Sequence, residues 1–141
     1  MTNNKKLFNQ ISIIGLGLIG SSLALSIRKS KISSRTVGYS RSPKTRNTSK
    51  RLKLVDKVSN KLEDSVRGSD LIIVCTPLSS YANIIKKIIP HISKGTIISD
   101  VGSAKEKTIN EIIPLLSNDD IFIPAHPIAG TEKSGPSAGF A

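Results

Sequence analysis

Three glycines follow a short apolar segment near the start of the chain. The stretch ISIIGLGLIGSS contains the apolar residues of 11–14 and then Gly15, Gly17 and Gly20. Beyond them, apolar residues recur every fourth position from 19 to 27, as on one face of a helix. A strand that ends in Gly-x-Gly-x-x-Gly and leads into a helix is typical of proteins that bind the pyrophosphate of a dinucleotide.

Each glycine has its own expected role. Gly15 permits a tight turn, Gly17 lets the backbone approach a phosphate without an intervening Cβ, and Gly20 lets the helix pack against the strand. The free N–H groups of the first helical turn, which begins with Leu18 and Ile19, are expected to bind the anion. The alternative is a tight turn that binds no ligand, because glycine-rich turns are common.

The residues after the next expected strand bear on the type of cofactor. Sites for NAD usually place an acidic residue there, to bind the ribose 2′-hydroxyl. This chain has Ser40 and Arg41 instead, and its next carboxylate is Asp56. A hydroxyl and a guanidinium suit a 2′-phosphate, which favours NADP over NAD. Alternatively, Ser40 and Arg41 form only a polar loop and the cofactor is NAD.

Other polar or turn-forming residues follow later strands. Thr76 and Pro77 end one strand where a dinucleotide would cross, although Pro77 is also an ordinary start for a helix. Gly102 and Ser103 follow another strand and are expected to face the nicotinamide and the substrate. Ser103 and Glu106 also have the spacing of a helix-capping box, which explains both residues without a ligand.

His126 follows the last expected strand. A neutral imidazole beside a nicotinamide could accept the proton of a substrate hydroxyl as hydride leaves its carbon. A lone histidine is more often structural, so spacing alone leaves both readings open. The sequence indicates no metal site.

Alternating strand and helix patterns must position these residues. Strands are expected at 11–14, 36–39, 55–59, 70–76, 96–101 and 120–124, with helices at 18–30, 44–53, 62–67, 81–92 and 109–116. This alternation predicts an α/β fold: a doubly wound parallel sheet of the Rossmann type between two helical layers. Ligands of such sheets bind beyond the carboxyl ends of the strands, where the residues above are found.

Composition limits the class of protein. A chain of 141 residues fits one domain, and its single cysteine, Cys75, lies in an apolar run and is expected to be a small buried hydrophobe. The net charge of +11 comes from Lys and Arg spread along the chain, with few aromatic residues, so a solvated basic surface is favoured over a nucleic-acid or membrane partner. The chain shows no signal peptide or membrane span, and we expect a cytoplasmic protein.

Three motifs together are more specific than any one of them. The segments GLGLIGSS, DVGSAK and HPIAGTEKSGPSAGF closely resemble those of the prephenate dehydrogenase family, which includes arogenate and cyclohexadienyl dehydrogenases. The resemblance covers almost the whole chain. A different dehydrogenase, such as a β-hydroxyacid type, would share the glycine motif but not the segment that begins at His126.

The resemblance implies a reaction and roles for three residues. Prephenate would be oxidatively decarboxylated to 4-hydroxyphenylpyruvate, or arogenate to tyrosine, with hydride passing to NAD(P)⁺. His126 would take up the proton of the ring hydroxyl, Ser103 would orient that hydroxyl and the histidine, and Glu132 would belong to the substrate pocket.

The chain departs from the family pattern in two respects. Many members have Asp at the position of Ser40. The absence of that carboxylate from this chain agrees with a preference for NADP. Members also continue into a helical domain that forms a homodimer and binds the substrate carboxylates, whereas this chain ends at Ala141. We therefore expect residues 1–141 to be the nucleotide-binding domain of such an enzyme. The alternative is an isolated dinucleotide-binding fragment without activity.

Overall fold

A computed structural model describes residues 6–125, which contain a parallel sheet of six strands in the order β3-β2-β1-β4-β5-β6. The strands are β1 (Phe8–Ile14), β2 (Ser33–Tyr39), β3 (Lys57–Ser59), β4 (Leu71–Val74), β5 (Ile97–Asp100) and β6 (Ile121–Ile123). The α-helices are α1 (Leu18–Ser30), α2 (Pro43–Arg51), α3 (Leu62–Val66), α4 (Tyr81–Ile88) and α5 (Lys105–Ile112). Short 3₁₀ turns are η1 (Leu78–Ser80), η2 (Ile89–His91) and η3 (Ile113–Leu115).

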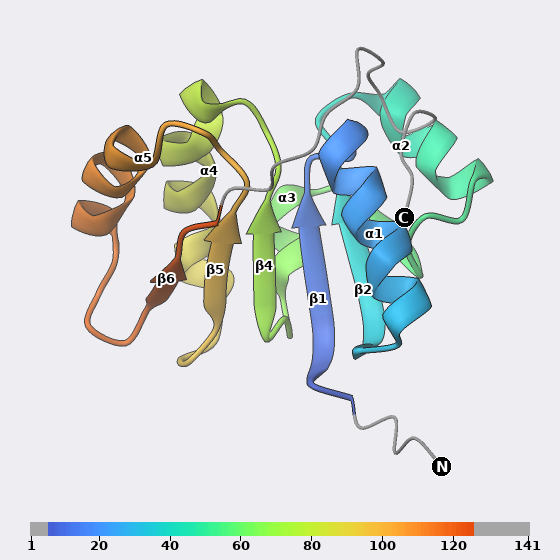
Figure 1. Cartoon of the computed structure of the whole chain (residues 1–141), viewed down its shortest axis with the longest axis horizontal. Coiled ribbons are helices and arrows are strands. Elements are labelled where there is room, and N and C mark those ends of the chain that lie inside the picture. Colours follow the sequence, from blue (N-terminus) through green and yellow to red (C-terminus); the bar gives the residue numbers. More distant parts are fainter. Residues whose placement is uncertain (1–5, 126–141) are drawn as a thin grey trace.

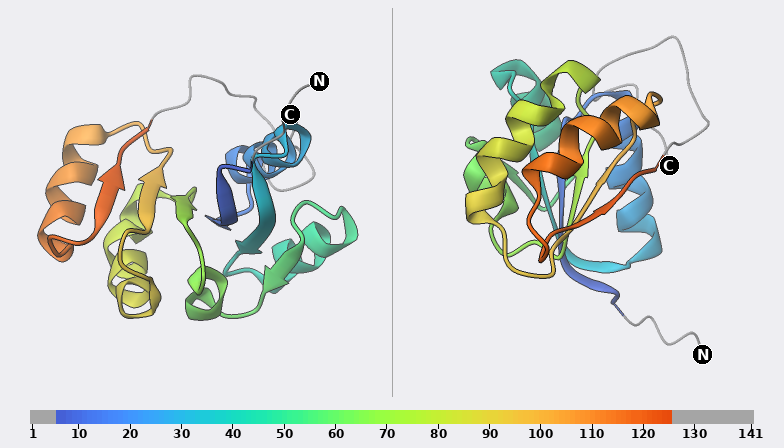
Figure 2. Two further views of the ribbon diagram at one scale, coloured as in Figure 1. Left: turned by 90° about the horizontal axis from the view of Figure 1, so that it is seen from below. Right: turned by 90° about the vertical axis from the view of Figure 1, so that its left-hand side faces the viewer.

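Helices lie on both faces of this sheet, with α1 in front of β1 and β2 and α4 behind the sheet in Figure 1. The two edge-on views in Figure 2 show the same layers. The strand order reverses between β1 and β4, so the chain winds outward from the centre in both directions. The expected doubly wound sheet is confirmed, and its switch point lies where β1 and β4 meet.

Alternation along β1 divides the core into two clusters. Ile11 and Ile13 pack with residues of α1, whereas Ile14 packs on the opposite face with residues of α3, α4 and α5. Successive side chains of a strand point to opposite faces, so a central strand must be apolar on both. Ser12, a polar residue in the middle of β1, is fully buried and donates a hydrogen bond to the carbonyl of Ser65 in α3.

The helix expected at 44–53 is α2, which begins one residue earlier at Pro43 and whose residues offer almost no apolar face. The Ser42 hydroxyl accepts a hydrogen bond from the N–H of Thr45 at 3.3 Å, and Pro43 is the first helical residue. An N-cap followed by proline therefore starts this helix in the absence of an amphipathic pattern.

Two helices end earlier than expected, each in a 3₁₀ turn that contains a proline. The helix expected to reach residue 92 ends at Ile88, followed by η2 with Pro90, and α5 ends at Ile112, followed by η3 with Pro114. Proline lacks the N–H that would continue an α-helix.

The expected capping box at the start of α5 is wrong. The N-cap residue is Ala104, no side chain caps this end, and Ser103 and Glu106 are both exposed. The N–H of Lys105 instead donates to the carbonyl of Ser103 at 3.1 Å, in a turn that precedes the helix. This turn shifts the helix start, so Ser103 lies outside the position from which it could cap.

Candidate dinucleotide site

The segments after β1, β2 and β4 meet at the carboxyl edge of the sheet, where the strand arrows of Figure 1 end. The N–H of Gly15 donates to the carbonyl of Tyr39 at 2.8 Å, and the N–H of Cys75 donates to the carbonyl of Ile14 at 2.7 Å. These bonds prolong the strand pairing by one residue on each side of β1. The glycine turn is therefore anchored at the switch point.

Two of the three glycines are required by the fold itself. Gly15 has a φ of +99°, and a Cβ there would lie 2.9 Å from the backbone carbon and oxygen of Cys75. A Cβ on Gly20 would overlap the carbonyl oxygen of Gly15. Both expected roles, the tight turn at Gly15 and the close helix packing at Gly20, are thus present in the geometry.

Gly17 differs from the other two. Its φ is −78°, which any residue can adopt, and a Cβ there would meet nothing within 4 Å. Neither backbone strain nor packing among the described residues explains a glycine at this position. A ligand that approaches the backbone would explain it, because a Cβ would occupy that space.

The start of α1 is suited to an anion. The N–H of Ser21 donates to the carbonyl of Gly17 at 2.9 Å, so the N–H groups of Leu18, Ile19 and Gly20 precede the first intrahelical bond. No side chain caps this helix end and no acidic residue occurs in its first turn. These N–H groups and the positive end of the helix dipole would favour a phosphate. The chain thus fits a pyrophosphate at this turn.

A cation that the sequence pattern did not single out contacts the turn after β2 from the neighbouring helix. The Nη1 atom of Arg46 donates to the carbonyl of Ser40 at 2.7 Å and to the carbonyl of Arg41 at 3.0 Å. Arg46 is half-buried and lies in α2, whereas the side chain of Arg41 is exposed. The sequence offered one signal for this contact. Arg46 follows the N-cap Ser42 by four residues, so its side chain lies one turn into the helix, close to the preceding turn.

The turn after β4 is held by hydroxyl contacts. The Ser80 hydroxyl donates to the Thr76 hydroxyl at 2.8 Å and lies 2.7 Å from the carbonyl of Pro77. A Cβ on Gly15 would lie 3.0 Å from Cγ2 of Thr76, which places Thr76 against the glycine turn. Pro77 immediately precedes η1, as expected for a helix start.

The turn after β5 packs against the side chains of Tyr81 and Asp100. A Cβ on Gly102 would lie 3.0 Å from the Tyr81 hydroxyl oxygen and 3.1 Å from Oδ2 of Asp100. Packing thus favours a residue without a side chain at Gly102, whether or not this residue also faces a nicotinamide. Ser103, next in the chain, is exposed at this edge.

Burial near Asp100 raises the pKa values of two groups. Burial, with a smaller contribution from the negative charge of Asp100, raises the pKa of Cys75 from 9.0 to about 12. The same two causes raise the pKa of the buried Tyr81 well above its usual range. Both groups are neutral at physiological pH. Cys75 is half-buried beside an apolar cluster, close to the expected small buried hydrophobe.

Two of the expected site residues, His126 and Glu132, lie outside the described residues. Within residues 6–125, no cluster of three or more His, Cys, Asp or Glu side chains could hold a metal ion. None of the helices in that range is long and apolar enough to cross a membrane.

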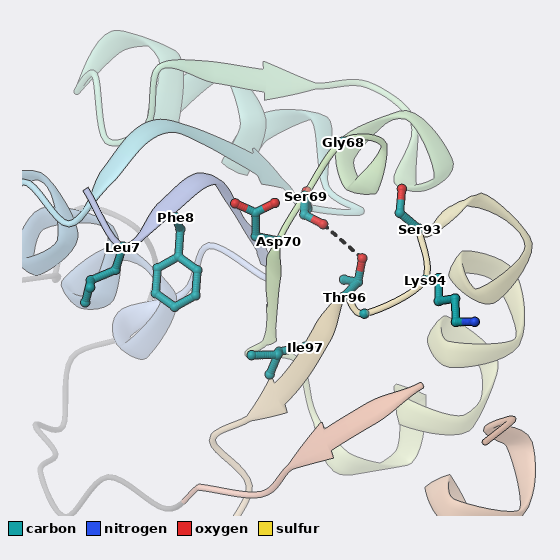
Figure 3. A pocket seen from close by; sticks show the side chains of 10 residues that line it. Leu7, Phe8, Gly68, Ser69, Asp70, Ser93, Lys94, Thr96 and Ile97 are labelled. Carbon is teal, nitrogen blue, oxygen red and sulfur yellow. Dashed lines mark hydrogen bonds between the residues drawn. The ribbon is translucent and has the colours of Figure 1, made fainter. Parts of the chain in front are cut away.

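A hollow of about 370 Å³ lies at the opposite edge of the sheet, where β1, β4 and β5 begin (Figure 3). Several of its polar groups are already bonded within the chain. The carboxylate of Asp70 accepts from the N–H of Asn9 at 2.5 Å, and the Thr96 hydroxyl donates to the carbonyl of Ser69 at 3.0 Å. This hollow is remote from the glycine turn and takes no part in the dinucleotide site.

Comparison with known sequences agrees with the motifs. A family profile described as the nucleotide-binding domain of prephenate dehydrogenase matches residues 23–141. Cyclohexadienyl dehydrogenase of Zymomonas mobilis is 41% identical over 135 residues, which are 95% of this chain and 45% of that protein. Prephenate dehydrogenase of Bacillus subtilis is 30% identical over 129 residues, which are 91% of this chain and 35% of that protein.

Solved structures of similar proteins share the fold. Prephenate dehydrogenase from A. aeolicus, in complex with hydroxyphenyl propionate and NAD⁺, is 29% identical with a TM-score of 0.84, over 94% of this chain and 46% of that chain. Synechocystis arogenate dehydrogenase is 32% identical with a TM-score of 0.77, over 92% of this chain and 45% of that chain. The chain thus spans less than half the length of these relatives. It belongs to the prephenate dehydrogenase family and contains that family's nucleotide-binding domain.

Proposed function

We propose that this chain binds NAD(P)⁺ and forms the nucleotide-binding half of an enzyme that oxidatively decarboxylates prephenate, arogenate or both. The observation that carries the proposal is the open space at Gly17, beside a helix start with free N–H groups. The NAD⁺ bound by the A. aeolicus relative supports the same class of cofactor.

The proposed roles of the site residues follow from the family motifs. When bound, NAD(P)⁺ supplies the acceptor for the hydride of the hydroxyl-bearing ring carbon. His126 accepts the proton of that hydroxyl, and Ser103 orients the hydroxyl from the exposed turn after β5. Glu132 belongs to the substrate pocket. The ring then loses its carboxylate as CO₂ and becomes aromatic.

NADP⁺ is the proposed preference. The turn after β2 has no carboxylate to bind a ribose 2′-hydroxyl, and it has the exposed guanidinium of Arg41 to pair with a 2′-phosphate. Arg46 braces this turn through two backbone carbonyls and adds positive charge beside it. Both features favour the phosphorylated cofactor.

The chain spans less than half the length of the relatives that it matches. Because the chain spans 45% of the Zymomonas relative, we propose that a second, helical domain completes the substrate pocket and forms a homodimer. The same partial coverage favours a second candidate, a dinucleotide-binding fragment that has no activity of its own.

Two measurements test the proposal. Isothermal titration of the chain with NAD⁺ and NADP⁺ measures binding, and we expect NADP⁺ to bind more tightly. Turnover of prephenate and arogenate is then measured with the chain joined to the C-terminal half of the Zymomonas relative. A joined protein that bound cofactor but oxidised neither substrate would contradict the assigned reaction. Turnover by the chain alone would rule out the inactive fragment.

A further inference from the structure

One buried carboxylate joins three segments at the carboxyl edge of the sheet. Asp100, the last residue of β5, is 1% exposed. Its Oδ2 accepts from the N–H of Gly102 at 3.0 Å, and its Oδ1 accepts from the N–H of Ala125 at 3.2 Å. Both oxygens lie 2.7 Å from Nζ of Lys105. The carboxylate therefore links β5, the turn before α5 and the residue that precedes His126.

Such a carboxylate is unfavourable unless it is fully paired. Burying an unpaired carboxylate is expensive, and two N–H donors and an ammonium compensate Asp100. Removing its side chain would leave the ammonium of Lys105, which is 26% exposed, without this partner. It would also leave the N–H groups of Gly102 and Ala125 without their acceptor.

Lys105 occupies a position at which a positive charge does not stabilise its own helix. Lys105 is the first residue of α5, where the helix dipole disfavours a positive charge. An acidic residue would suit that position better in an isolated helix. The lysine at this position is explained by the carboxylate that it pairs with.

The turn between β5 and α5 has little freedom to shift away from Asp100. Gly102 fits closely over the carboxylate and over the buried hydroxyl of Tyr81, as the hypothetical Cβ distances of 3.1 and 3.0 Å indicate. The Tyr81 hydroxyl in turn lies 3.4 Å from the carbonyl of Val74 in β4. The turn that contains Ser103 is thus fixed to two strands.

We infer that Asp100 is a positioning residue. With Lys105 as its counter-ion, it holds the turn that contains Ser103 and the backbone at Ala125 in fixed positions relative to each other. This inference rests on the proposed function, in which Ser103 and His126 must act on the same hydroxyl. It predicts that catalysis depends on a group that contacts neither substrate nor cofactor.

The test uses four variants and a matched control. Asp100→Ala removes both acceptors, whereas Asp100→Asn retains one acceptor oxygen and loses the charge. Lys105→Met removes the counter-ion, and Lys105→Arg retains it. Asp119→Asn is the control, because Asp119 forms an ion pair with Lys94 at 3.5 Å in which both side chains are exposed.

Amide hydrogen exchange in the ¹⁵N-labelled chain measures the positioning without any need for activity. Asp100→Ala is expected to raise exchange at Gly102 and Ala125 by about 10-fold or more, with Ile13 in β1 unchanged. Asp100→Asn should keep one of these two amides protected. Unchanged exchange at both amides would overturn the inference. Equal loss of protection at Ile13 would also overturn it, because that pattern indicates a general loss of stability.

Kinetics of the joined protein supply the second readout. Asp100→Asn and Lys105→Met are expected to lower kcat by about 10- to 100-fold, as small misplacements of reacting groups do, with NAD(P)⁺ affinity within about twofold. Lys105→Arg should recover most of the lost kcat, and Asp119→Asn should leave kcat unchanged. Unchanged kcat in both Asp100→Asn and Lys105→Met would overturn the inference. Absence of turnover in the unmodified joined protein would refute the proposed reaction, and hydrogen exchange would still decide the role of Asp100.

Discussion

The Cα of Gly20 faces the carbonyl oxygen of Gly15 so closely that a Cβ on Gly20 would overlap that oxygen. The first turn of α1 is therefore pressed against the end of β1. Gly17, between these two glycines in the sequence, faces open space. One motif thus contains glycines of two kinds, which separate substitutions can distinguish.

Gly20→Ala is expected to destabilise the chain by about 1–3 kcal/mol, because α1 must move away from β1 to admit the methyl group. Urea denaturation followed by circular dichroism measures the change. Gly17→Ala is the matched control and should reduce stability by no more than about 1 kcal/mol, as alanine is a poorer N-cap than glycine. Equal destabilisation by both substitutions would contradict the packing argument.

Gly17→Ala should instead weaken dinucleotide binding by about 10-fold or more, equivalent to about 1.4 kcal/mol. The physical reason is that the new methyl group occupies the space through which a pyrophosphate would approach the N–H groups of α1. Titration calorimetry with NAD⁺ and NADP⁺ measures the effect. Undiminished affinity for both cofactors would show that the pyrophosphate does not lie against Gly17.

Arg41→Ala is expected to weaken the binding of NADP⁺ by about 1–3 kcal/mol, the range for a lost hydrogen bond to a charged group. The binding of NAD⁺ should be nearly unaffected. Arg46→Ala should also weaken NADP⁺, because the turn at residues 40–41 loses its brace. Arg51→Ala controls for the loss of one positive charge, since Arg51 is exposed at the other end of α2. Equal losses for NAD⁺ and NADP⁺ in the Arg41 variant would argue against a 2′-phosphate contact.

His126→Asn is expected to lower kcat of the joined protein by roughly 100-fold or more, because asparagine cannot accept the hydroxyl proton. Cofactor affinity should be largely retained. Steady-state kinetics with prephenate and a separate cofactor titration measure the two effects. A comparable loss of cofactor affinity would indicate that His126 is structural.

Cys75 should react slowly with iodoacetamide near pH 8, because a pKa of about 12 leaves almost no thiolate. Mass spectrometry of the labelled chain measures the rate, with the urea-unfolded chain as the control. Labelling of the folded chain as fast as that of the unfolded chain would contradict the raised pKa.

The same shift predicts a pH dependence of stability. The pKa of Cys75 is raised in the folded state from 9.0 to about 12, so the folded chain retains a proton that the unfolded chain loses above pH 9. The stabilisation is therefore complete below about pH 9 and decreases as the pH rises towards 12, by at most about 1.4 kcal/mol per pH unit. Tyr81 acts in the same direction. Cys75→Ala should make the alkaline decrease shallower, as measured by urea denaturation at several pH values.

Element types were predictable from the sequence where local patterns and burial agree. The helix expected at 18–30 is α1 with identical bounds, because glycines precede it and its apolar residues keep a helical period. The second strand was expected to begin at Thr36 but begins at Ser33. Its polar first residues pair with β1, as Ser33 does with Phe8. Because this pairing uses backbone groups alone, a search for apolar residues does not detect it.

Site residues whose role depends on distant contacts were harder to predict. Arg46 braces the turn at Ser40 only because α2 folds back over the end of β2. Asp100 resembled an ordinary acidic residue at a strand end, yet it accepts a hydrogen bond from Ala125, 25 positions away. The expected capping box failed for a related reason, because the turn before α5 is fixed by Asp100 and Tyr81 rather than by Ser103.

The sequence by itself determined the family, the parallel alternation of strands and helices, and the motifs that lie at one edge of the sheet. These depend on residue types at short spacing, which fix backbone conformation and apolar periodicity locally. The tertiary structure confirmed the turn at Gly15 and the close packing at Gly20 that the motif predicts, and only it joined Asp100 to Lys105, Gly102 and Ala125. Such relationships arise from strand register and from the space left between packed segments, and neither is encoded in any single stretch of the chain.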